Sequence, residues 1–216
     1  MVKILLVEDH TLVRSGIRSL LESSPDMKVV GDVGDGRRAI ESCQELMPDV
    51  VLTDVEMPSI NGIETARQIH AAMPDVKIIM LSMHGDPQYV FESLKAGASG
   101  YVLKDAAFTE LLDAIKAVME GRRYLSAPLA DLVMEDYVRR AKGKETGTEL
   151  DKLSSREREI LQLVAEGRSS GQVAEMIHIS VRTVDTHRYN VMQKLGIHSI
   201  AGLTKFAIAH GLTSLK

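Results

Sequence analysis

Acidic side chains directly follow two of the apolar runs in this sequence. The run ILLV at residues 4–7 is followed by Glu8 and Asp9, and the run VVLT at residues 50–53 is followed by Asp54. A fourth run closes with Ser82, and a fifth is followed by Lys104. Asp54 alone would be ordinary for a turn that follows a strand. Carboxylates, a hydroxyl and an amine at comparable positions indicate a shared site instead.

The chemistry of these groups suits a phosphoryl group and a divalent cation. Three carboxylates that lie close together repel one another unless a positive group binds or some of them are protonated. Carboxylate oxygens suit Mg²⁺, which commonly uses one or two carboxylates and keeps water or phosphate oxygens. Lys104 and the metal would neutralise the equatorial oxygens of a phosphoryl group, which a carboxylate can accept in line. We predict that Asp54 is this acceptor, because it follows the central strand.

Five repeats of a short apolar run and an amphipathic stretch would position these residues. We expect strands over residues 3–7, 29–33, 50–53, 77–82 and 99–103, and helices over residues 11–21, 37–46, 62–72, 87–96 and 108–119. Near-continuous apolar strands that alternate with helices predict a doubly wound α/β fold, in which helices cover both faces of a five-stranded parallel sheet. Such sheets bind ligands at the carboxyl ends of their strands, where the polar residues fall.

The pattern changes after residue 121. We assign residues 1–121 to the α/β domain and residues 122–152 to a linker that is helical over 128–140 and flexible over 141–152, a polar segment with two glycines. Residues 153–216 predict a small all-α domain of four helices. Ser154, Ser169 and Ser180 are the expected N-caps of the first three helices, and the fourth helix is expected over residues 200–210.

Composition and charge limit the class of protein. The 216 residues are 44% hydrophobic and 26% charged, which is typical of a soluble, cytoplasmic globular protein. No apolar run reaches the roughly 20 residues of a membrane helix, so we expect no membrane partner. The single cysteine, Cys43, excludes an internal disulfide. Residues 1–125 carry 13 Lys and Arg against 19 Asp and Glu, whereas residues 153–216 carry 8 against 5, so the two parts should meet different partners.

Four motifs resemble those of the receiver domain of bacterial two-component response regulators. They are VEDH at 7–10, TDVEMPSINGIE at 53–64, LSMH at 81–84 and KAGASGYVLKD at 95–105, and the resemblance covers residues 1 to about 121. It implies a flavodoxin-like fold in which a sensor histidine kinase phosphorylates Asp54. It also implies phosphoryl contacts and a switch from Ser82, Lys104 and Tyr101, and a Mg²⁺ site formed by Glu8 through water, Asp9, Asp54 and the backbone carbonyl of Glu56.

Glu56 and His84 each lie two residues beyond a site residue. At that position either side chain could hinder or order the water that attacks an acyl phosphate. We therefore expect Glu56 and His84 to set the rate at which phosphorylated Asp54 loses its phosphoryl group.

Residues 153 to about 211 resemble the LuxR-type helix-turn-helix domain. LSSRERE, TVDTH and KLG carry the resemblance, and a receiver followed by this domain is the arrangement of the NarL/FixJ class. The resemblance implies a transcription regulator that binds double-stranded DNA and forms a homodimer when phosphorylated, with RNA polymerase as a further partner. It does not imply an enzyme, apart from autocatalytic phosphoryl transfer to Asp54 and hydrolysis from it.

The third helix of this domain has one apolar face and one free face. Val184, His187, Val191 and Leu195 follow a 3-4-4 spacing and should pack inward. The candidate DNA contacts on the free side are Arg182, Asp185, Thr186, Tyr189, Gln193 and Lys194. We expect Thr186 and Tyr189 at base edges, and Arg182 and Lys194 nearer phosphates. Asp185 could accept a hydrogen bond from cytosine N4 and so shift sequence preference.

Two other functions fit parts of this pattern. An Asp-nucleophile phosphohydrolase would share the first site, but it needs a substrate pocket or a cap insertion, and the loops of this chain are short. A regulator whose receiver acts only through protein contacts would not need the complete set of Asp9, Asp54, Ser82 and Lys104. That set and the second domain together favour a phosphorylation-dependent regulator.

Overall fold

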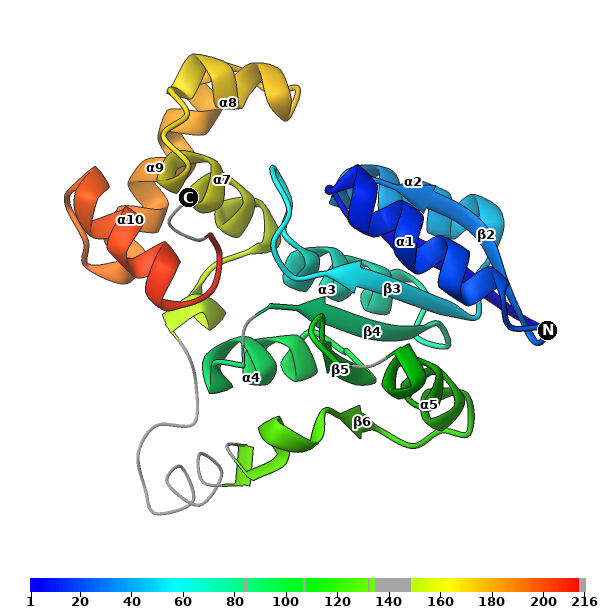
Figure 1. Cartoon of the computed structure of the whole chain (residues 1–216). Helices are drawn as coiled ribbons and strands as arrows, with labels where there is room; N and C mark the ends of the chain where they lie inside the picture. The colour runs from blue at the N-terminus through cyan, green and yellow to red at the C-terminus, as the bar shows by residue number, and fades with distance from the viewer. Residues whose placement is uncertain (84, 107, 132, 135–148, 214–216) are drawn as a thin grey trace. The chain divides into compact units, whose positions relative to one another are not determined.

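Two compact units make up the chain, Met1–Arg139 and Arg140–Lys216. The computed structural model describes residues 1–83, 85–106, 108–131, 133–134 and 149–213, and Figure 1 draws the others as a thin grey trace. None of the helices within those ranges is both long and apolar enough to cross a membrane.

A parallel sheet is the centre of the first unit (Figure 1). Its strands are β1 (Val2–Val7), β2 (Met27–Val33), β3 (Val50–Asp54), β4 (Lys77–Ser82), β5 (Gly100–Leu103) and β6 (Tyr124–Leu125). They lie in the order β2-β1-β3-β4-β5-β6, and each neighbouring pair is parallel. The predicted parallel α/β sheet is confirmed, but the predicted number of five strands is wrong, because β6 adds a sixth strand beside β5.

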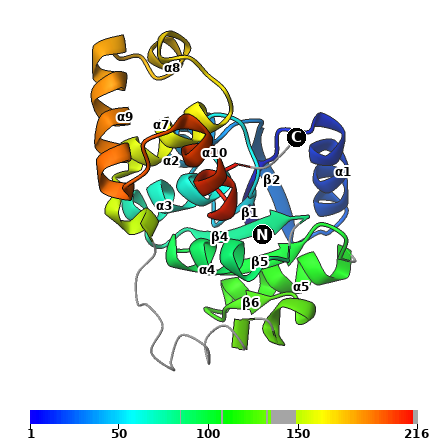
Figure 2. The ribbon, with the colours of Figure 1, turned by 90° about the vertical axis from the view of Figure 1, so that its left-hand side faces the viewer.

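Helices cover both faces of this sheet. They are α1 (Thr11–Glu22), α2 (Gly36–Leu46), α3 (Gly62–Ala72), α4 (Pro87–Lys95) and α5 (Phe108–Met119). Leu21 of α1 and Ile115 of α5 pack on one face, whereas Cys43, Ile69 and Val90 of α2, α3 and α4 pack on the other. Figure 2 shows α1 and α5 on one side of the sheet, with α3 and α4 on the opposite side.

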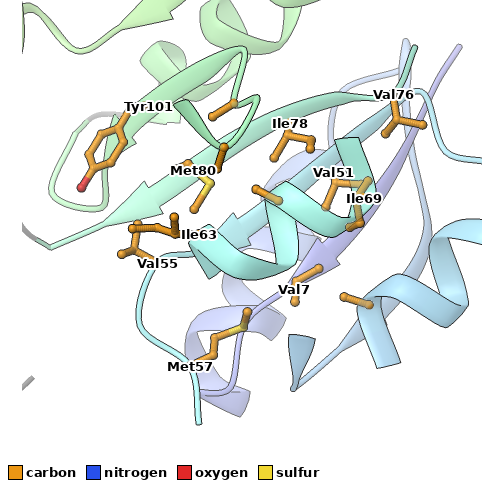
Figure 3. Packing of buried hydrophobic residues seen from close by; sticks show 14 of the residues in the cluster. Val7, Val51, Val55, Met57, Ile63, Ile69, Val76, Ile78, Met80 and Tyr101 are labelled. Carbon is orange, nitrogen blue, oxygen red and sulfur yellow. The ribbon is translucent and has the colours of Figure 1, made fainter. Parts of the chain in front are cut away.

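Alternating side chains of the central strands supply both cores. Ile4 and Leu6 of β1 point into the core beneath α1 and α5, whereas Leu5 and Val7 point into the other core. Both sets must be apolar because successive strand residues face opposite sides of the sheet. Figure 3 shows the second core, where β-strand residues such as Val51 pack against helix α3.

The chain after α5 remains part of the first unit. The amide of Ser126 donates a hydrogen bond to the carbonyl of Tyr101 at 3.0 Å. Residues 127–131 and 133–134 are helical, and Leu129 is buried in the same core as Tyr101. The predicted linker, residues 122–152, therefore begins with residues that belong to the α/β unit. The rest of the predicted helix over 128–140 lies outside the described residues.

The second unit consists of helices over its described residues. They are the 3-10 turn η1 (Glu149–Lys152) and the helices α7 (Ser155–Ala165), α8 (Ser170–Met176), α9 (Val181–Leu195) and α10 (Ile200–Ala209). The predicted caps Ser154, Ser169 and Ser180 are all present. Leu150 of η1 is buried with the core residues of this unit. The predicted flexible segment 141–152 therefore does not extend over η1, and residues 141–148 lie outside the described ranges.

Candidate functional site

The carboxyl ends of β1 and β3 bring Glu8 and Asp54 together. The two strands pair in parallel with Val7 opposite Thr53, so the next residue of each is one of these acids. Residues 4–7 and 50–53 are apolar or uncharged and buried, and the next residue of each strand carries a charged side chain. The side chain of Glu8 is fully buried, and that of Asp54 is 5% exposed.

Lys104 joins the two acids from the end of β5. Its backbone amide donates a hydrogen bond to the carbonyl of Ser82 at 2.8 Å, which fixes the lysine beside β4. Its Nζ lies 2.7 Å from Oε2 of Glu8 and 2.7 Å from Oδ2 of Asp54. Lys104 thus contacts two other predicted site residues, and the three come from the ends of three different strands.

Burial and charge have opposite effects on this cluster. Burial raises the pKa of Asp54, and the hydrogen bond and charge of Lys104 lower it only in part. Burial would lower the pKa of Lys104, but hydrogen bonds and charges of Asp54 and Glu8 outweigh burial and raise this pKa. The amine is thus held protonated, while the ionised form of Asp54 is disfavoured. Any further positive group in this pocket would stabilise the carboxylate.

The acidic pocket has donor atoms suited to a small divalent cation. One ligand atom from each of Glu8, Asp9, His10 and Asp54 lies within 4.8 Å of the others. Oε2 of Glu8 and Oδ1 of Asp9 are buried, with Nζ of Lys104 at 2.7 Å from the first and Nδ1 of His10 at 2.9 Å from the second. A cluster of buried carboxylate oxygens fits a hard cation such as Mg²⁺.

Ser82 of β4 lies two residues beyond Met80, which pairs with Tyr101 of β5. Leu81 pairs with Asp54 in the β3–β4 register, so Ser82 is one residue beyond the phosphoacceptor candidate. Tyr101 is fully buried, and Figure 3 shows it in the same core as Met80. Burial raises the pKa of the Tyr101 phenol, and a hydrogen bond with Ser82 lowers it in part. The two residues of the predicted switch are therefore in contact.

Helix α9 presents the predicted DNA contacts. It packs against α7 and α8 through Val184 and Val191, which are buried, as the 3-4-4 spacing predicts. The six candidate contacts are all exposed: Arg182, Asp185, Thr186, Tyr189, Gln193 and Lys194. A helix with a free polar face, packed across a preceding helix, fits the major groove of DNA.

Family models match both units of the chain. Residues 4–116 match the response regulator receiver domain, and residues 151–207 match the bacterial regulatory proteins of the luxR family. The chain is a NarL/FixJ-type response regulator. The regulator therefore has a receiver domain, which is the α/β unit, and a LuxR-type DNA-binding domain, which is the helical unit.

Relatives of the regulator match it along nearly their whole length. It is 37% identical over 213 residues to the transcriptional regulatory protein MctR of Rhizobium johnstonii, covering 99% of this chain and 96% of that one. It is 38% identical over 212 residues to the response regulator UvrY of Escherichia coli, covering 98% and 96%. These relatives are transcriptional regulators rather than enzymes.

A solved structure of two RcsB dimers bound to two parallel DNAs is similar to the regulator. The TM-score is 0.60 at 27% sequence identity, and the match covers 97% of this chain and 98% of that one. The match therefore extends over both domains.

Glu56 lies beside the acidic pocket of the receiver. Its backbone amide donates a hydrogen bond to Oδ1 of Asp54 at 3.3 Å. Tyr89 of α4 is near this loop, since burial and then the charges of Glu56 and Asp86 raise the pKa of Tyr89 to about 12. Sequence reasoning missed Tyr89, because no local pattern connects α4 with the loop after β3. His84, the second predicted tuning residue, lies outside the described residues.

His10 is a further neighbour of the pocket that sequence reasoning missed. Its Nδ1 lies 2.9 Å from Oδ1 of Asp9 and 3.1 Å from Oε1 of Glu8, and its side chain is 67% exposed. Its place directly after the two acids in VEDH was the available signal.

Two of the predicted DNA contacts, Lys194 and Asp185, have partners on other helices of their own domain. Nζ of Lys194 lies 2.6 Å from Oε2 of Glu157, the capping-box residue of α7. Oδ1 of Asp185 accepts a hydrogen bond from Oγ of Ser170 at 2.8 Å, and the same Oγ accepts one from Arg188 at 2.7 Å. These partners lie 37 and 15 residues away from Lys194 and Asp185, so local spacing gave no sign of them.

Proposed function

We propose that phosphorylation of Asp54 by a sensor histidine kinase controls the binding of this regulator to double-stranded DNA. The observation that carries the proposal is the contact of the Lys104 amine with both Asp54 and Glu8 at 2.7 Å. It places a positive donor beside a nearly buried carboxylate at the carboxyl end of a central strand. A carboxylate nucleophile beside a positive donor suits in-line phosphoryl transfer to an acid.

The transfer uses groups that already surround Asp54. An Oδ atom of Asp54 forms a bond to phosphorus while the bond from phosphorus to the kinase histidine nitrogen breaks. Lys104 then moves from the carboxylates to the oxygens of the phosphoryl group, and the hydroxyl of Ser82 donates a hydrogen bond to one of them. Asp9, Asp54 and the backbone carbonyl of Glu56 would hold Mg²⁺, with Glu8 acting through water. The metal, when bound, supplies positive charge that offsets the negative oxygens.

The switch reaches the core through Ser82. A Ser82 hydroxyl that turns to the phosphoryl group changes its hydrogen bond with Tyr101, whose ring lies in the core beside β4. Glu56 and His84 set the lifetime of the acyl phosphate. Glu56→Ala and His84→Ala should each change the dephosphorylation rate, and an unchanged decay of both would remove this role.

The DNA-binding domain reads the major groove with α9. Thr186 and Tyr189 contact base edges, Arg182 and Gln193 lie on the same exposed face, and Asp185 biases the sequence that is bound. Phosphorylation leads to a homodimer, and dimers of the similar protein RcsB bound to DNA support this part of the proposal. RNA polymerase is the expected further partner at a promoter.

Phosphorylation at Asp54 can be tested on the purified full chain. Incubation with acetyl phosphate and Mg²⁺ should add one phosphoryl group to the wild type and none to Asp54→Asn, as measured by intact mass. Asp105→Asn is the matched control, since it removes an exposed carboxylate beside Lys104 and should leave phosphorylation unchanged. Equal labelling of wild type and Asp54→Asn would contradict the assignment.

A further inference from the structure

Arg14 of α1 contacts the backbone behind the acidic pocket. Its Nη1 donates a hydrogen bond to the carbonyl oxygen of Glu8. Its Nε donates to Oδ1 of Asp32, on β2, at 3.2 Å. The side chain is 19% exposed, so these bonds are largely shielded from water. One guanidinium thus ties the end of β1 to β2.

The segment that Arg14 holds carries three donor residues of the pocket. Glu8, Asp9 and His10 connect β1 with α1, and the N-cap His10 gives α1 no side-chain cap. On its other side, the amide of Glu8 donates a hydrogen bond to the carbonyl of Val33 at 3.0 Å. The Glu8 backbone is therefore fixed through its amide by β2 and through its carbonyl by Arg14. The backbone from which the carboxylates of Glu8 and Asp9 extend is thereby held in place.

We infer that Arg14 is a positioning residue that sets the Mg²⁺ affinity of the acidic pocket. The inference rests on the proposed function, because it takes the pocket to be a Mg²⁺ site. Contacts that orient metal ligands from outside typically change metal affinity 10–100-fold when they are removed. The charge of Arg14 acts in the opposite direction by repelling the cation. Asp32 pairs with that charge, so the loss of orientation outweighs the loss of repulsion.

Arg18 provides a matched control on the same helix. Its guanidinium pairs with Asp32 and with Glu22, as Arg14 pairs with Asp32. Within the described ranges, Arg18 makes no hydrogen bond to Glu8 or Asp9. Arg18→Met therefore removes an ion pair from the same carboxylate and leaves the Glu8 carbonyl bonded to Arg14.

Mg²⁺ binding to the full chain, without any phosphoryl donor, tests the role of Arg14. Calorimetry should give a Mg²⁺ dissociation constant about tenfold higher for Arg14→Met than for the wild type. Arg18→Met should stay within about twofold of the wild type. The dissociation constant of Arg14→Lys should fall between those of Arg14→Met and Arg18→Met, because an ammonium keeps the charge but cannot donate in the same planar fork. Competition with Mn²⁺, followed by electron paramagnetic resonance, gives a second readout of the same site.

The outcomes separate this inference from the proposed function. Equal affinities of folded Arg14→Met and Arg18→Met would overturn the role of Arg14. If Arg14→Met does not fold, Arg14→Lys carries the test, and an affinity equal to that of Arg18→Met would overturn the role. A wild type that binds no Mg²⁺ would contradict both the inference and the metal site of the proposed function. If the wild type binds Mg²⁺ and Arg14→Met binds it with the same affinity, only the inference about Arg14 is contradicted.

Discussion

Two buried carboxylates, on Glu8 and Asp54, share the ammonium group of Lys104 in the receiver. Each contact is 2.7 Å long, yet burial still raises the pKa of Asp54. A buried acid whose ionised form is disfavoured lowers the stability of the folded state at neutral pH. Binding of a cation in the pocket, or transfer of a phosphoryl group to Asp54, offsets this loss of stability. Asp54, the residue that is proposed to react, thus lowers the stability of the folded receiver.

The raised pKa of Asp54 predicts a pH-dependent loss of stability. Its stabilising contribution is fully present below the unfolded-state pKa of about 3.9 and is lost as the pH rises through the raised, folded-state value. Without Mg²⁺, Asp54→Asn should therefore become more stable than the wild type as the pH increases from 4 to 7. Urea unfolding of the receiver at several pH values measures this difference, with Asp105→Asn as the control. A difference that does not vary with pH would contradict the prediction.

Gly62 allows α3 to begin directly against the proposed phosphoacceptor. Its amide donates a hydrogen bond to the carbonyl of Val55 at 2.9 Å, and a Cβ at this position would lie 1.8 Å from the carbonyl oxygen of Asp54. Gly62→Ala must therefore displace backbone, and we expect it to lower the free energy of unfolding by about 3 kcal/mol and to slow phosphorylation.

Gly16→Ala is the matched control for Gly62→Ala. Gly16 lies in α1, where a Cβ would meet nothing within 4 Å. This change should leave phosphorylation intact and stabilise the receiver by about 0.5–1 kcal/mol. If Gly62→Ala were as stable and as active as Gly16→Ala, the close approach of α3 to Asp54 would be wrong.

At the scale of elements, the sequence predicts what a local pattern can encode. Residues 62–72, 77–82 and 108–119 have the predicted bounds, because apolar spacing and caps determine them. The two residues of β6 carry no alternation. Backbone hydrogen bonds from Tyr124 to Ser99 and from Ser126 to Tyr101 hold this segment in the sheet. The site residues also divide into those that a local pattern predicts and those that depend on tertiary contacts. The fold brings strand-end residues together, whereas the Lys194–Glu157 contact depends on tertiary packing.

The segment after α5 is predicted to stabilise the receiver. Leu129 is 1% exposed and packs in the core with Tyr101 and Val90. Leu129→Ala should lower the free energy of unfolding of the receiver by about 2–5 kcal/mol, because it leaves a cavity in this core. Met134→Ala, on the same segment and 64% exposed, should change it by less than about 0.5 kcal/mol. Equal urea midpoints for the two variants would mean that the segment is a linker after all.

The Lys194–Glu157 pair predicts how the stability of the DNA-binding domain depends on pH. Burial would raise the pKa of Glu157, but hydrogen bonds from Lys194 and Ser154 lower it overall. The contribution of ionised Glu157 to the free energy of unfolding is present above its unfolded-state pKa of about 4.3. This contribution is lost as the pH falls through the lowered pKa of the folded state. Lys194→Met should reduce this contribution by no more than about 1 kcal/mol, because Lys194 is 42% exposed.

The same pair predicts a small role for Lys194 at DNA phosphates. Arg182→Met should reduce the slope of log affinity against log salt by about 1, as expected when one phosphate contact is lost. Lys194→Met should leave this slope nearly unchanged, because Glu157 already neutralises the amine. Fluorescence anisotropy at several salt concentrations measures both slopes, and equal reductions would place Lys194 at a phosphate.

For the whole molecule, the charge distribution restricts how phosphorylation can act. Residues 1–125 carry 13 basic against 19 acidic side chains, and residues 153–216 carry 8 against 5. A phosphoryl group on Asp54 replaces one carboxylate charge with about two negative charges at neutral pH, so it makes the part that is already acidic more negative by about one charge. Direct attraction to DNA cannot then explain tighter binding. The proposed dimerisation can explain it, since linking two DNA-binding domains can raise affinity by about 10²–10⁴ without any new contact.

The most direct test of the account measures DNA binding and dimerisation together. Duplexes selected from a random pool are titrated with the full chain, with and without acetyl phosphate and Mg²⁺, while sedimentation follows the oligomeric state. We predict that the phosphorylated wild type becomes a dimer and binds at least about tenfold more tightly, whereas Asp54→Ala stays monomeric and binds as the untreated protein does. A labelled wild type with unchanged DNA affinity, or an equal response from Asp54→Ala, would contradict the central claim.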